Sequence, residues 1–274
     1  MRMNAPPSDS TGDPRFSAIV LAADRRRDDP LLAHNGVCAK GLIDLGGTRM
    51  IERVITALEH SEQVGDILLA GPPRECLQTC DSLHARIEAG RVRWQAPAGS
   101  PASSAWQAMH SLPPQRPVLV TTADHPLLRA EIIDHFLAAA RASGAELAAA
   151  VTTIAAVQAR FPGAHKTVMK FSDAGYCGCN LFAFMSPASR RVASVWRQVE
   201  QQRKNPLYLI RQLGILSVLR YSLGRLDIDT AAARLSRKLG VHICPLRLPF
   251  AEAAIDVDTV EDQAFVRAIL AGEK

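Results

Sequence analysis

The stretch that most constrains the fold covers residues 17–47, where a short apolar segment runs directly into charged residues. The segment Ala18–Ala22 has β-branched residues at its centre and ends abruptly, as a buried central strand of a parallel sheet does. Three consecutive arginines, Arg25–Arg27, follow it, and Lys40 stands alone before the next apolar residues. Ligands of open α/β sheets bind beyond the carboxyl ends of such strands, and clustered cations there favour phosphate. The stretch therefore predicts an α/β fold with an anion site; the alternative is that the arginines form a solvated surface loop.

Short apolar runs and amphipathic segments alternate along the rest of the chain, which favours a sheet covered by helices. Strands are expected at 64–70, 91–94, 118–122, 145–153, around 166–170, at 241–244 and at 255–258. Helices are expected at 50–58 with Thr48 as the cap, at 75–83, up to 110, at 129–142 and from Thr259 onward. The pattern predicts a three-layer α/β/α sandwich with a mostly parallel mixed sheet.

The chain is expected to form one domain preceded by a tail. Residues 1–15 are rich in Pro, Ser, Asp and Gly and lack the apolar core of a signal peptide, so a flexible N-terminal tail is expected. Residues 16–274 form the expected domain, because a hydrophobic content of 47% is enough for a large core. Residues 187–239 have a helical pattern and exceed what a minimal fold of this class needs, so we expect a helical insertion there.

The composition excludes several classes of protein. The net charge of +5 is modest, aromatics make up 5%, and no basic block is interleaved with them, which disfavours nucleic acid as a partner. The most apolar stretch, 147–159, is too short to span a membrane, so a soluble, cytoplasmic protein without membrane insertion is expected. The six cysteines have no zinc-finger spacing and are expected to be reduced. The chain lacks the GxxxxGK[ST] and GxGxxG motifs of P-loop and simple Rossmann proteins. A monomer and a homo-oligomer both fit this composition.

The order of strand, basic loop, lone lysine and paired glycines resembles the opening of the MobA-like NTP transferases, nucleotidyltransferases with a GT-A-type fold. That family opens roughly with LAAG, a variable loop and K-x-L-x-x-x-G. In this chain the motif stands as Leu21-Ala22-Ala23-Asp24 and then as Lys40-Gly41-Leu42 up to Gly46-Gly47. Asp24 therefore stands where the family usually has glycine.

The resemblance implies a nucleotide site built from two loops. Lys40 and Arg25 would act on the phosphates and, with Asp124, would be the catalytic residues. The backbone around Leu21, Ala22 and Ala23 would lie against the nucleotide. In the family a second loop of small residues holds the base and ribose, and here it contains Ala98, Gly99, Ser100 and Ser103. The alternative for the second loop is an ordinary helix start with a serine cap.

Two aspartates are candidates for a metal site. Asp124 follows the strand 118–122, and a carboxylate at a buried strand end suits a metal-bound phosphate. The ending Asp256-Val257-Asp258-Thr259 resembles the family's DIDTPEDL, and it implies that Asp258 joins Asp124 in binding Mg²⁺. The alternatives are that Asp124 caps the helix at 129–142 and that Asp258 merely precedes the capping Thr259.

The acceptor side is expected between residues 161 and 184. The family has a Gly-x-Asn element that lines the acceptor pocket, and here it would be Gly178-Cys179-Asn180. Lys166 and Lys170 precede it and would suit an anionic small-molecule acceptor. An ordinary β-turn is the alternative for the Gly-x-Asn element.

The function that these features favour is Mg²⁺-dependent nucleotidyl transfer from an NTP, CTP or GTP by resemblance, to a phosphorylated acceptor with release of pyrophosphate. One alternative is a GT-A glycosyltransferase that uses a sugar nucleotide, although those enzymes usually carry Asp-x-Asp where this chain has Asp124-His125-Pro126. Another is a nucleotide-binding homologue without activity, which Asp24 and the absence of glycine in the loop would suit.

Overall fold

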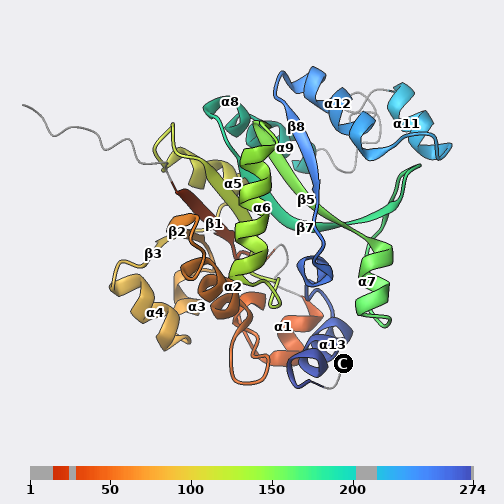
Figure 1. Cartoon of the computed structure of the whole chain (residues 1–274). Coiled ribbons are helices and arrows are strands. Elements are labelled where there is room, and N and C mark those ends of the chain that lie inside the picture. Colours follow the sequence, from red (N-terminus) through yellow and green to blue (C-terminus); the bar gives the residue numbers. More distant parts are fainter. Residues whose placement is uncertain (1–14, 25–28, 202–214, 273–274) are drawn as a thin grey trace, which may run out of the picture.

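The computed structural model describes residues 15–24, 29–201 and 215–272, and its centre is one eight-stranded sheet (Figure 1). The strand order is β3-β2-β1-β4-β7-β5-β8, with β6 paired to β7. The strands are β1 (Phe16–Leu21), β2 (Val64–Ala70), β3 (Val92–Gln95), β4 (Val118–Thr122), β5 (Leu147–Thr153), β6 (Met169–Lys170), β7 (Gly175–Phe184) and β8 (Ile243–Arg247).

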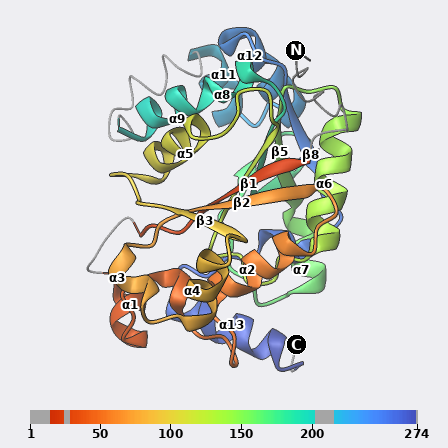
Figure 2. The same ribbon diagram turned by 90° about the vertical axis from the view of Figure 1, so that its left-hand side faces the viewer.

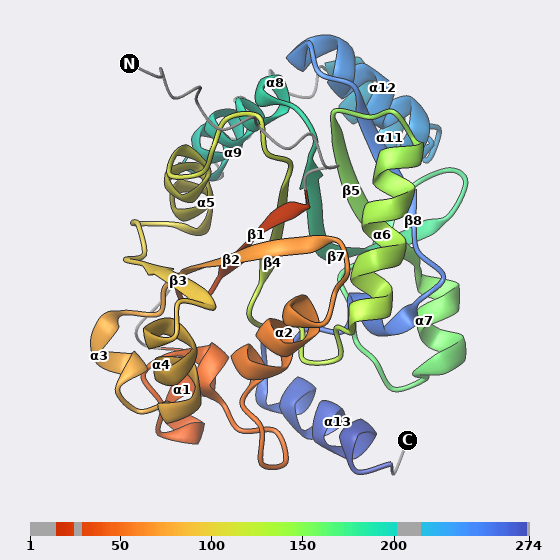
Figure 3. The same cartoon turned by 60° about the vertical axis from the view of Figure 1, so that its left-hand side comes forward.

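The sheet is mixed because β7 runs antiparallel to both of the strands beside it. Strands β3, β2, β1 and β4 run parallel to one another, and β8 runs parallel to β5. Strand β7 runs antiparallel between β4 and β5 and joins the two parallel parts (Figure 3). All six residues of β1 are buried, which confirms the central strand predicted from residues 18–22. The predicted α/β architecture with a mostly parallel mixed sheet is confirmed.

Helices cover both faces of the sheet (Figure 2). One face packs against a core that includes Val20, Ile55 and Phe136. The helices and 3₁₀ turns on this face are α1 (Pro30–Asn35), η1 (Lys40–Leu42), α2 (Met50–Glu59), α3 (Arg74–Leu77), α4 (Asp81–Glu88), α6 (Ala130–Ala142), α7 (Ile154–Arg160), η2 (Ala251–Ala254) and α13 (Val260–Leu270). The other face packs against a smaller core that includes Ile19 and Met109. It carries α5 (Pro101–His110), α8 (Pro187–Arg190), α9 (Val192–Gln201), α11 (Ile215–Ser222) and α12 (Ile228–Leu239).

Three local predictions differ from the structure. Helix α2 begins after Arg49 instead of Thr48, and the Glu52 carboxylate accepts a 3.0 Å hydrogen bond from the backbone N–H of Arg49. The helix expected at 75–83 is broken into α3 and α4. The expected strand at 255–258 is absent in this described stretch, since η2 ends at Ala254 and an irregular segment leads into α13. The capping box of Thr259 and Asp262 at the start of α13 is present as predicted.

The Gly178–Asn180 element is part of a strand and forms no β-turn, so that alternative is wrong. It lies inside β7, where the pairing with β5 shifts register between Ala149 and Val151. Asn180 has a φ of 47°, a left-handed conformation that is uncommon for a residue other than glycine. A glycine followed by an irregular residue in a strand is typical of a β-bulge, and the sequence pattern does not separate a bulge from a turn.

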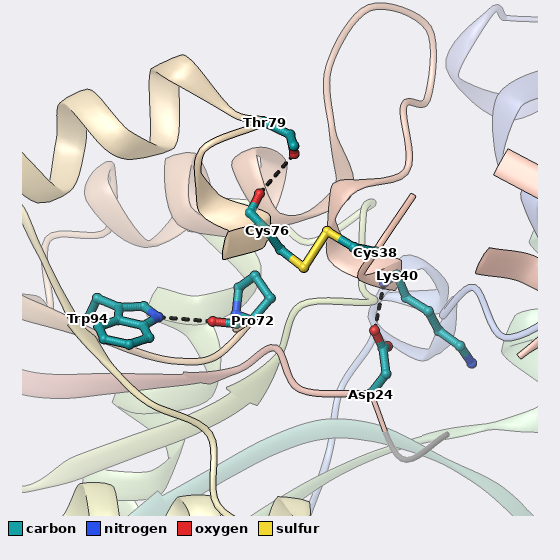
Figure 4. Close-up of a disulfide and its surroundings, with 7 residues drawn as sticks. All are labelled: Asp24, Cys38, Lys40, Pro72, Cys76, Thr79 and Trp94. Carbon is teal, nitrogen blue, oxygen red and sulfur yellow. Dashed lines mark hydrogen bonds between the residues drawn. A yellow bond between two sulfur atoms is a disulfide. The ribbon is translucent and has the colours of Figure 1, made fainter. Parts of the chain in front are cut away.

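Two cysteines are paired, contrary to the expectation that all six are reduced. Cys38 precedes η1 and Cys76 lies in α3, and the two form a disulfide with their Cα atoms 5.9 Å apart (Figure 4). They are 38 residues apart in sequence, so their pairing depends on the fold and is not visible in local spacing. Within the described residues, no helix is both long and apolar enough to cross a membrane.

Candidate active site

A cavity with a volume of about 550 Å³ begins at the carboxyl ends of β1 and β4. It continues along β7 beneath α9 on the sheet face that carries α5. Its lining includes the polar residues Asp24, Asp29, Lys40, Thr122, Asp124, Asn180, Asp256 and Asp258. This is the position at which open α/β sheets bind ligands, and the volume lies in the range of small-molecule sites.

Lys40 projects into the cavity from η1 and is held by carboxylates. Its ammonium Nζ lies 2.8 Å from Asp29 Oδ2 and 3.4 Å from Asp258 Oδ1. Burial alone would lower the pKa of Lys40, but the hydrogen bond to Asp29 and the charge of Asp258 outweigh it and raise that pKa above its ordinary value. The side chain is therefore an ammonium at any physiological pH. The next residue must be small, because a Cβ on Gly41 would lie 3.3 Å from the Cβ of Ala123 at the end of β4.

Asp24 fixes the backbone of the Lys40 turn. Its Oδ2 accepts a hydrogen bond of 3.0 Å from the backbone N–H of Lys40 (Figure 4). Asp24 does not have the positive φ that would favour glycine, so the replacement of the family's glycine costs no backbone strain here. Burial raises the pKa of Asp24 from 3.8 to about 6, and the nearby charges of Asp29 and Asp124 add to that rise. The cavity thus contains a carboxylate whose ionised form is poorly stabilised.

Asp124 lies at the end of β4 and does not cap a helix. Helix α6 begins after Arg129 without a side-chain cap, so that alternative is wrong. The Asp124 carboxylate instead accepts a short hydrogen bond from the hydroxyl of Thr122 and lies 3.8 Å from Nε2 of His125. Burial raises its pKa, and Asp256 and Asp258 raise it further, while His125 and Thr122 act in the opposite direction.

The loop before α13 brings two more carboxylates to the same place. The backbone N–H of Val257 donates a 3.0 Å hydrogen bond to the carbonyl oxygen of Asp124, which joins the loop to the end of β4. Asp256 forms an ion pair with Lys166, and Asp258 pairs with Lys40. Asp124 and Asp258, predicted as a metal pair, therefore line one cavity although they are far apart in sequence.

The predicted nucleotide residues fall into two groups. Leu21, Ala23 and Lys40 line the cavity, whereas Ala22 is buried and its N–H donates to the carbonyl of Ala70. Arg25 lies outside the described residues.

The serine loop has a structural role in the described chain. Ser100 caps α5 by accepting a 3.2 Å hydrogen bond from the N–H of Ser103. Of residues 98–103 only Pro101 lines the cavity, so Ala98, Gly99, Ser100 and Ser103 do not. Their contact with a base and ribose stays a prediction.

Of the predicted acceptor residues only Asn180 lines the cavity. Its amide Nδ2 lies 2.8 Å from Nε2 of His125, which is 2% exposed. Gly178 and Lys170 are exposed, and Lys166 is engaged by Asp256. The predicted basic acceptor site is therefore not assembled at this cavity by the described residues.

Sequence reasoning missed several lining residues. Asp256 was visible as the first carboxylate of the D-x-D-T motif, and Asp24 as a departure from the family pattern. The aromatic residues Phe182, Phe184 and Trp196 gave no local signal, since such residues usually belong to a core. Asp29 follows the basic loop, and only the fold brings it to Lys40.

The carboxylates suit a magnesium ion that brings its own further ligands. Among the residues that the structure describes, no group of three or more His, Cys, Asp or Glu side chains is arranged to hold a metal ion. Mg²⁺ usually takes only one or two protein carboxylates and keeps water and phosphate as its other ligands. Asp124, whose carboxylate is desolvated, and the exposed Asp258 line the same cavity, and together they fit that demand.

Fold and cavity together define an α/β protein with a cavity over the strand ends, between a lysine and several carboxylates. A family model for the MobA-like NTP transferase domain matches residues 18–240. The chain belongs to that family.

Solved structures of similar fold support this placement. A hypothetical transferase from Thermus thermophilus is 29% identical, with 91% of this chain and 99% of that chain covered and a TM-score of 0.76. A 4-diphosphocytidyl-2C-methyl-D-erythritol synthase from Anaerococcus prevotii is 14% identical, with 94% and 96% covered and a TM-score of 0.57. A CMP:2-keto-3-deoxy-manno-octonic acid synthetase in complex with CTP is 16% identical, with 94% and 100% covered and a TM-score of 0.57. The last two show the fold alone. A search of curated proteins gives no significant match.

Proposed function

We propose that the protein is a Mg²⁺-dependent nucleotidyltransferase that moves an NMP group from an NTP to a phosphorylated small-molecule acceptor. An oxygen of the acceptor's phosphate attacks the α-phosphorus of the NTP and forms a new P–O bond. The bond from the α-phosphorus to the bridging oxygen breaks, and pyrophosphate leaves with the electron pair. Such a reaction needs positioning and charge neutralisation more than it needs a covalent nucleophile.

The observation that carries the proposal is the position of Lys40. Its ammonium lies in the cavity at the strand ends, 2.8 Å and 3.4 Å from carboxylates of two other segments. A lysine held in this way is a preformed point charge for the phosphates of a nucleotide. The hydrogen bond from its backbone to Asp24 keeps the turn in place before any ligand arrives.

Asp124 and Asp258 would hold the magnesium ion, which supplies charge to the phosphates that are attacked and released. Thr122 would orient the Asp124 carboxylate through its hydroxyl. His125 would hold the Asn180 amide, which faces the acceptor. Arg25, outside the described residues, remains a proposed phosphate contact on the strength of the sequence alone.

The nucleotide of first choice is CTP. The sequence resemblance favours CTP or GTP, and two proteins of similar fold are a diphosphocytidyl synthase and a synthetase solved with CTP. GTP is the second choice.

The test is a pyrophosphate-release assay with each of the four NTPs, Mg²⁺ and a panel of phosphorylated acceptors. Thermal shift gives NTP binding independently of turnover, because a ligand present at a hundred times its Kd should stabilise the fold by about 2.7 kcal/mol. Pyrophosphate that appears only with NTP, acceptor and Mg²⁺ together supports the proposal. Binding of every NTP without pyrophosphate would favour a homologue without activity, and hydrolysis of a sugar nucleotide would favour a glycosyltransferase.

A further inference from the structure

The cavity has two unlike ends. The polar end lies at the tips of β1 and β4 and contains Lys40 and the carboxylates described above. The opposite end, called here the apolar end, lies beneath α9 and is lined by Leu147, Phe182, Phe184, Val192, Ala193 and Trp196. Of these side chains only that of Trp196 contains a polar atom.

Strand β7 connects the two ends. Asn180, Phe182 and Phe184 are two residues apart and so lie on one face of the strand. The strand therefore presents an amide next to His125 and then two aromatic rings in a line leading away from the reaction centre. Phe182 and Trp196 remain half-buried although they belong to the core on this face, because the cavity exposes them.

Helix α9 is fixed over this end by contacts outside the cavity. Val192, Ala193 and Trp196 lie on one face of the helix, and the Trp196 ring centroid is 6.3 Å from that of Phe182. Arg197 lies over the ring of Trp106 in α5 at 4.4 Å, and Glu200 accepts a 3.1 Å hydrogen bond from the N–H of Ala102. The apolar end is thus a formed surface against which a ligand can pack.

The charges around the cavity argue against a polar ligand body at this end. Among the lining residues that the structure describes, Lys40 is the only cation, and it belongs to the polar end. Lys166 is neutralised by Asp256, and Lys170 is exposed on β6. Hydroxyl groups of a sugar or polyol would lose water here without gaining partners from the aliphatic and phenyl side chains.

We propose that the acceptor carries an apolar body, a short hydrocarbon chain or an aryl ring, attached to the phosphate that reacts. The inference rests on the proposed function, because that function assigns the β1 side of the cavity to the nucleotide and the β7 side to the acceptor. The phosphate of the acceptor lies at the polar end, near Asn180, and its apolar body fills the space between β7 and α9. This acceptor is a hydrophobic monophosphate and differs from a sugar phosphate or a polyol phosphate.

The experiment measures acceptor binding by calorimetry on the full chain, with Mg²⁺ and a non-hydrolysable analogue of the NTP that gives the largest thermal shift. The probes are dimethylallyl monophosphate for the hydrocarbon chain and phenyl phosphate for the aryl ring. Glycerol 3-phosphate and glucose 1-phosphate are the polar comparisons. At least one apolar phosphate should bind about tenfold more tightly than both polar ones, or better. The probe that binds more tightly identifies the kind of apolar body.

Trp196→Ala should reduce that preference to about threefold or less by removing one wall of the apolar end. Trp94→Ala is the matched control, since Trp94 lies on β3, does not line the cavity and packs against the core on the opposite face of the sheet, and it should keep the preference. If Trp196→Ala does not fold, Val192→Ser places a hydroxyl in the apolar end on the first turn of α9 and should also weaken the preference.

Equal or tighter binding of a polar phosphate by the unmodified protein would overturn the inference. So would the absence of binding by both apolar phosphates, or an unchanged preference in a folded Trp196→Ala. Pyrophosphate release in parallel samples, which contain the same acceptors and Mg²⁺ but the hydrolysable NTP, tests the proposed function separately. A binding preference without pyrophosphate would refute nucleotidyl transfer and leave the apolar site standing.

Discussion

Replacing Asp24 by Asn should stabilise the folded protein above pH 7. Burial raises the pKa of Asp24 from 3.8 to about 6, so the folded protein binds this proton more tightly than the unfolded chain does. The stability of the unmodified protein must therefore fall as the pH rises from about 4 to about 6, and the loss persists at higher pH. Asparagine has no charge to desolvate, and its oxygen can still accept the hydrogen bond from the Lys40 N–H.

The magnitude follows from the pKa change. About two pH units at about 1.4 kcal/mol each give an upper limit of about 3 kcal/mol. Because the carboxylate reaches the cavity and is partly solvated, we expect Asp24→Asn to gain about 1 to 3 kcal/mol at pH 8 and almost nothing at pH 4.

Urea denaturation of both proteins at pH 4 and pH 8 measures this difference directly. Asp44→Asn at the exposed Asp44 is the matched control, and it should change the free energy of unfolding by less than about 0.5 kcal/mol at either pH. A less stable Asp24→Asn at pH 8, or an equal gain at both pH values, would refute the assignment of Asp24 as a desolvated carboxylate. Groups at ligand sites often lower the stability of the folded protein in exchange for function. Because Asp24 lines the cavity, we also expect Asp24→Asn to bind Mg²⁺ and NTP less well.

Five further substitutions test the site and the disulfide. Lys40→Ala should weaken NTP binding about tenfold or more in calorimetry in a protein that still folds, because the Lys40 side chain lies in the cavity and not in the hydrophobic core; unchanged affinity would place the phosphates elsewhere. Asp124→Asn and Asp258→Asn should each lower Mg²⁺-dependent turnover by about a hundredfold or more at nearly native Tm, and near-normal turnover in both would exclude the metal pair. Asn180→Gly, which keeps the positive φ without strain, should raise the KM for the acceptor and leave that for the NTP nearly unchanged; the reverse would move Asn180 to the nucleotide side. Cys38→Ser opens a cross-link over 38 residues and should lower the Tm without reductant, whereas equal Tm values with and without reductant in the unmodified protein would contradict the disulfide.

The parts of the fold that short-range patterns determine were predictable. Strand β1 is recognised by its apolar run, and α2 by the spacing of Met50, Ile51, Val54, Ile55 and Leu58, all of which are buried. The cap of α13 depends on two residues three positions apart. Each of these signals lies within one element, so a single sequence contains it completely.

The pairings within the site depend on distant segments and were not predictable. Lys166 was assigned to an anionic acceptor because a lysine in an isolated sequence has no visible partner, but the fold places Asp256 against it. Asp124 was predicted correctly at a strand end, yet the sequence does not show that Thr122 orients its carboxylate. The aromatic residues of β7 gave no sign of a cavity in the sequence, because a strand that passes from core to cavity has the same pattern in both.

The charges of the cavity determine the form in which a nucleotide can enter. Five carboxylates face the cavity, those of Asp24, Asp29, Asp124, Asp256 and Asp258. Lys166 pairs with Asp256 from outside the lining, and Lys40 is the single ammonium among the described lining residues to oppose the other four. A bare triphosphate would bring several further negative charges into a space where burial already raises the pKa values of Asp24 and Asp124. Repulsion between unit charges a few ångströms apart costs several kcal/mol when the surroundings are less polar than water, and one lysine cannot offset the sum. The carboxylates favour binding only if a divalent cation accompanies the phosphates. Under the proposed function the NTP therefore enters as its magnesium complex, and the excess of carboxylates makes the cavity select that complex over the free nucleotide.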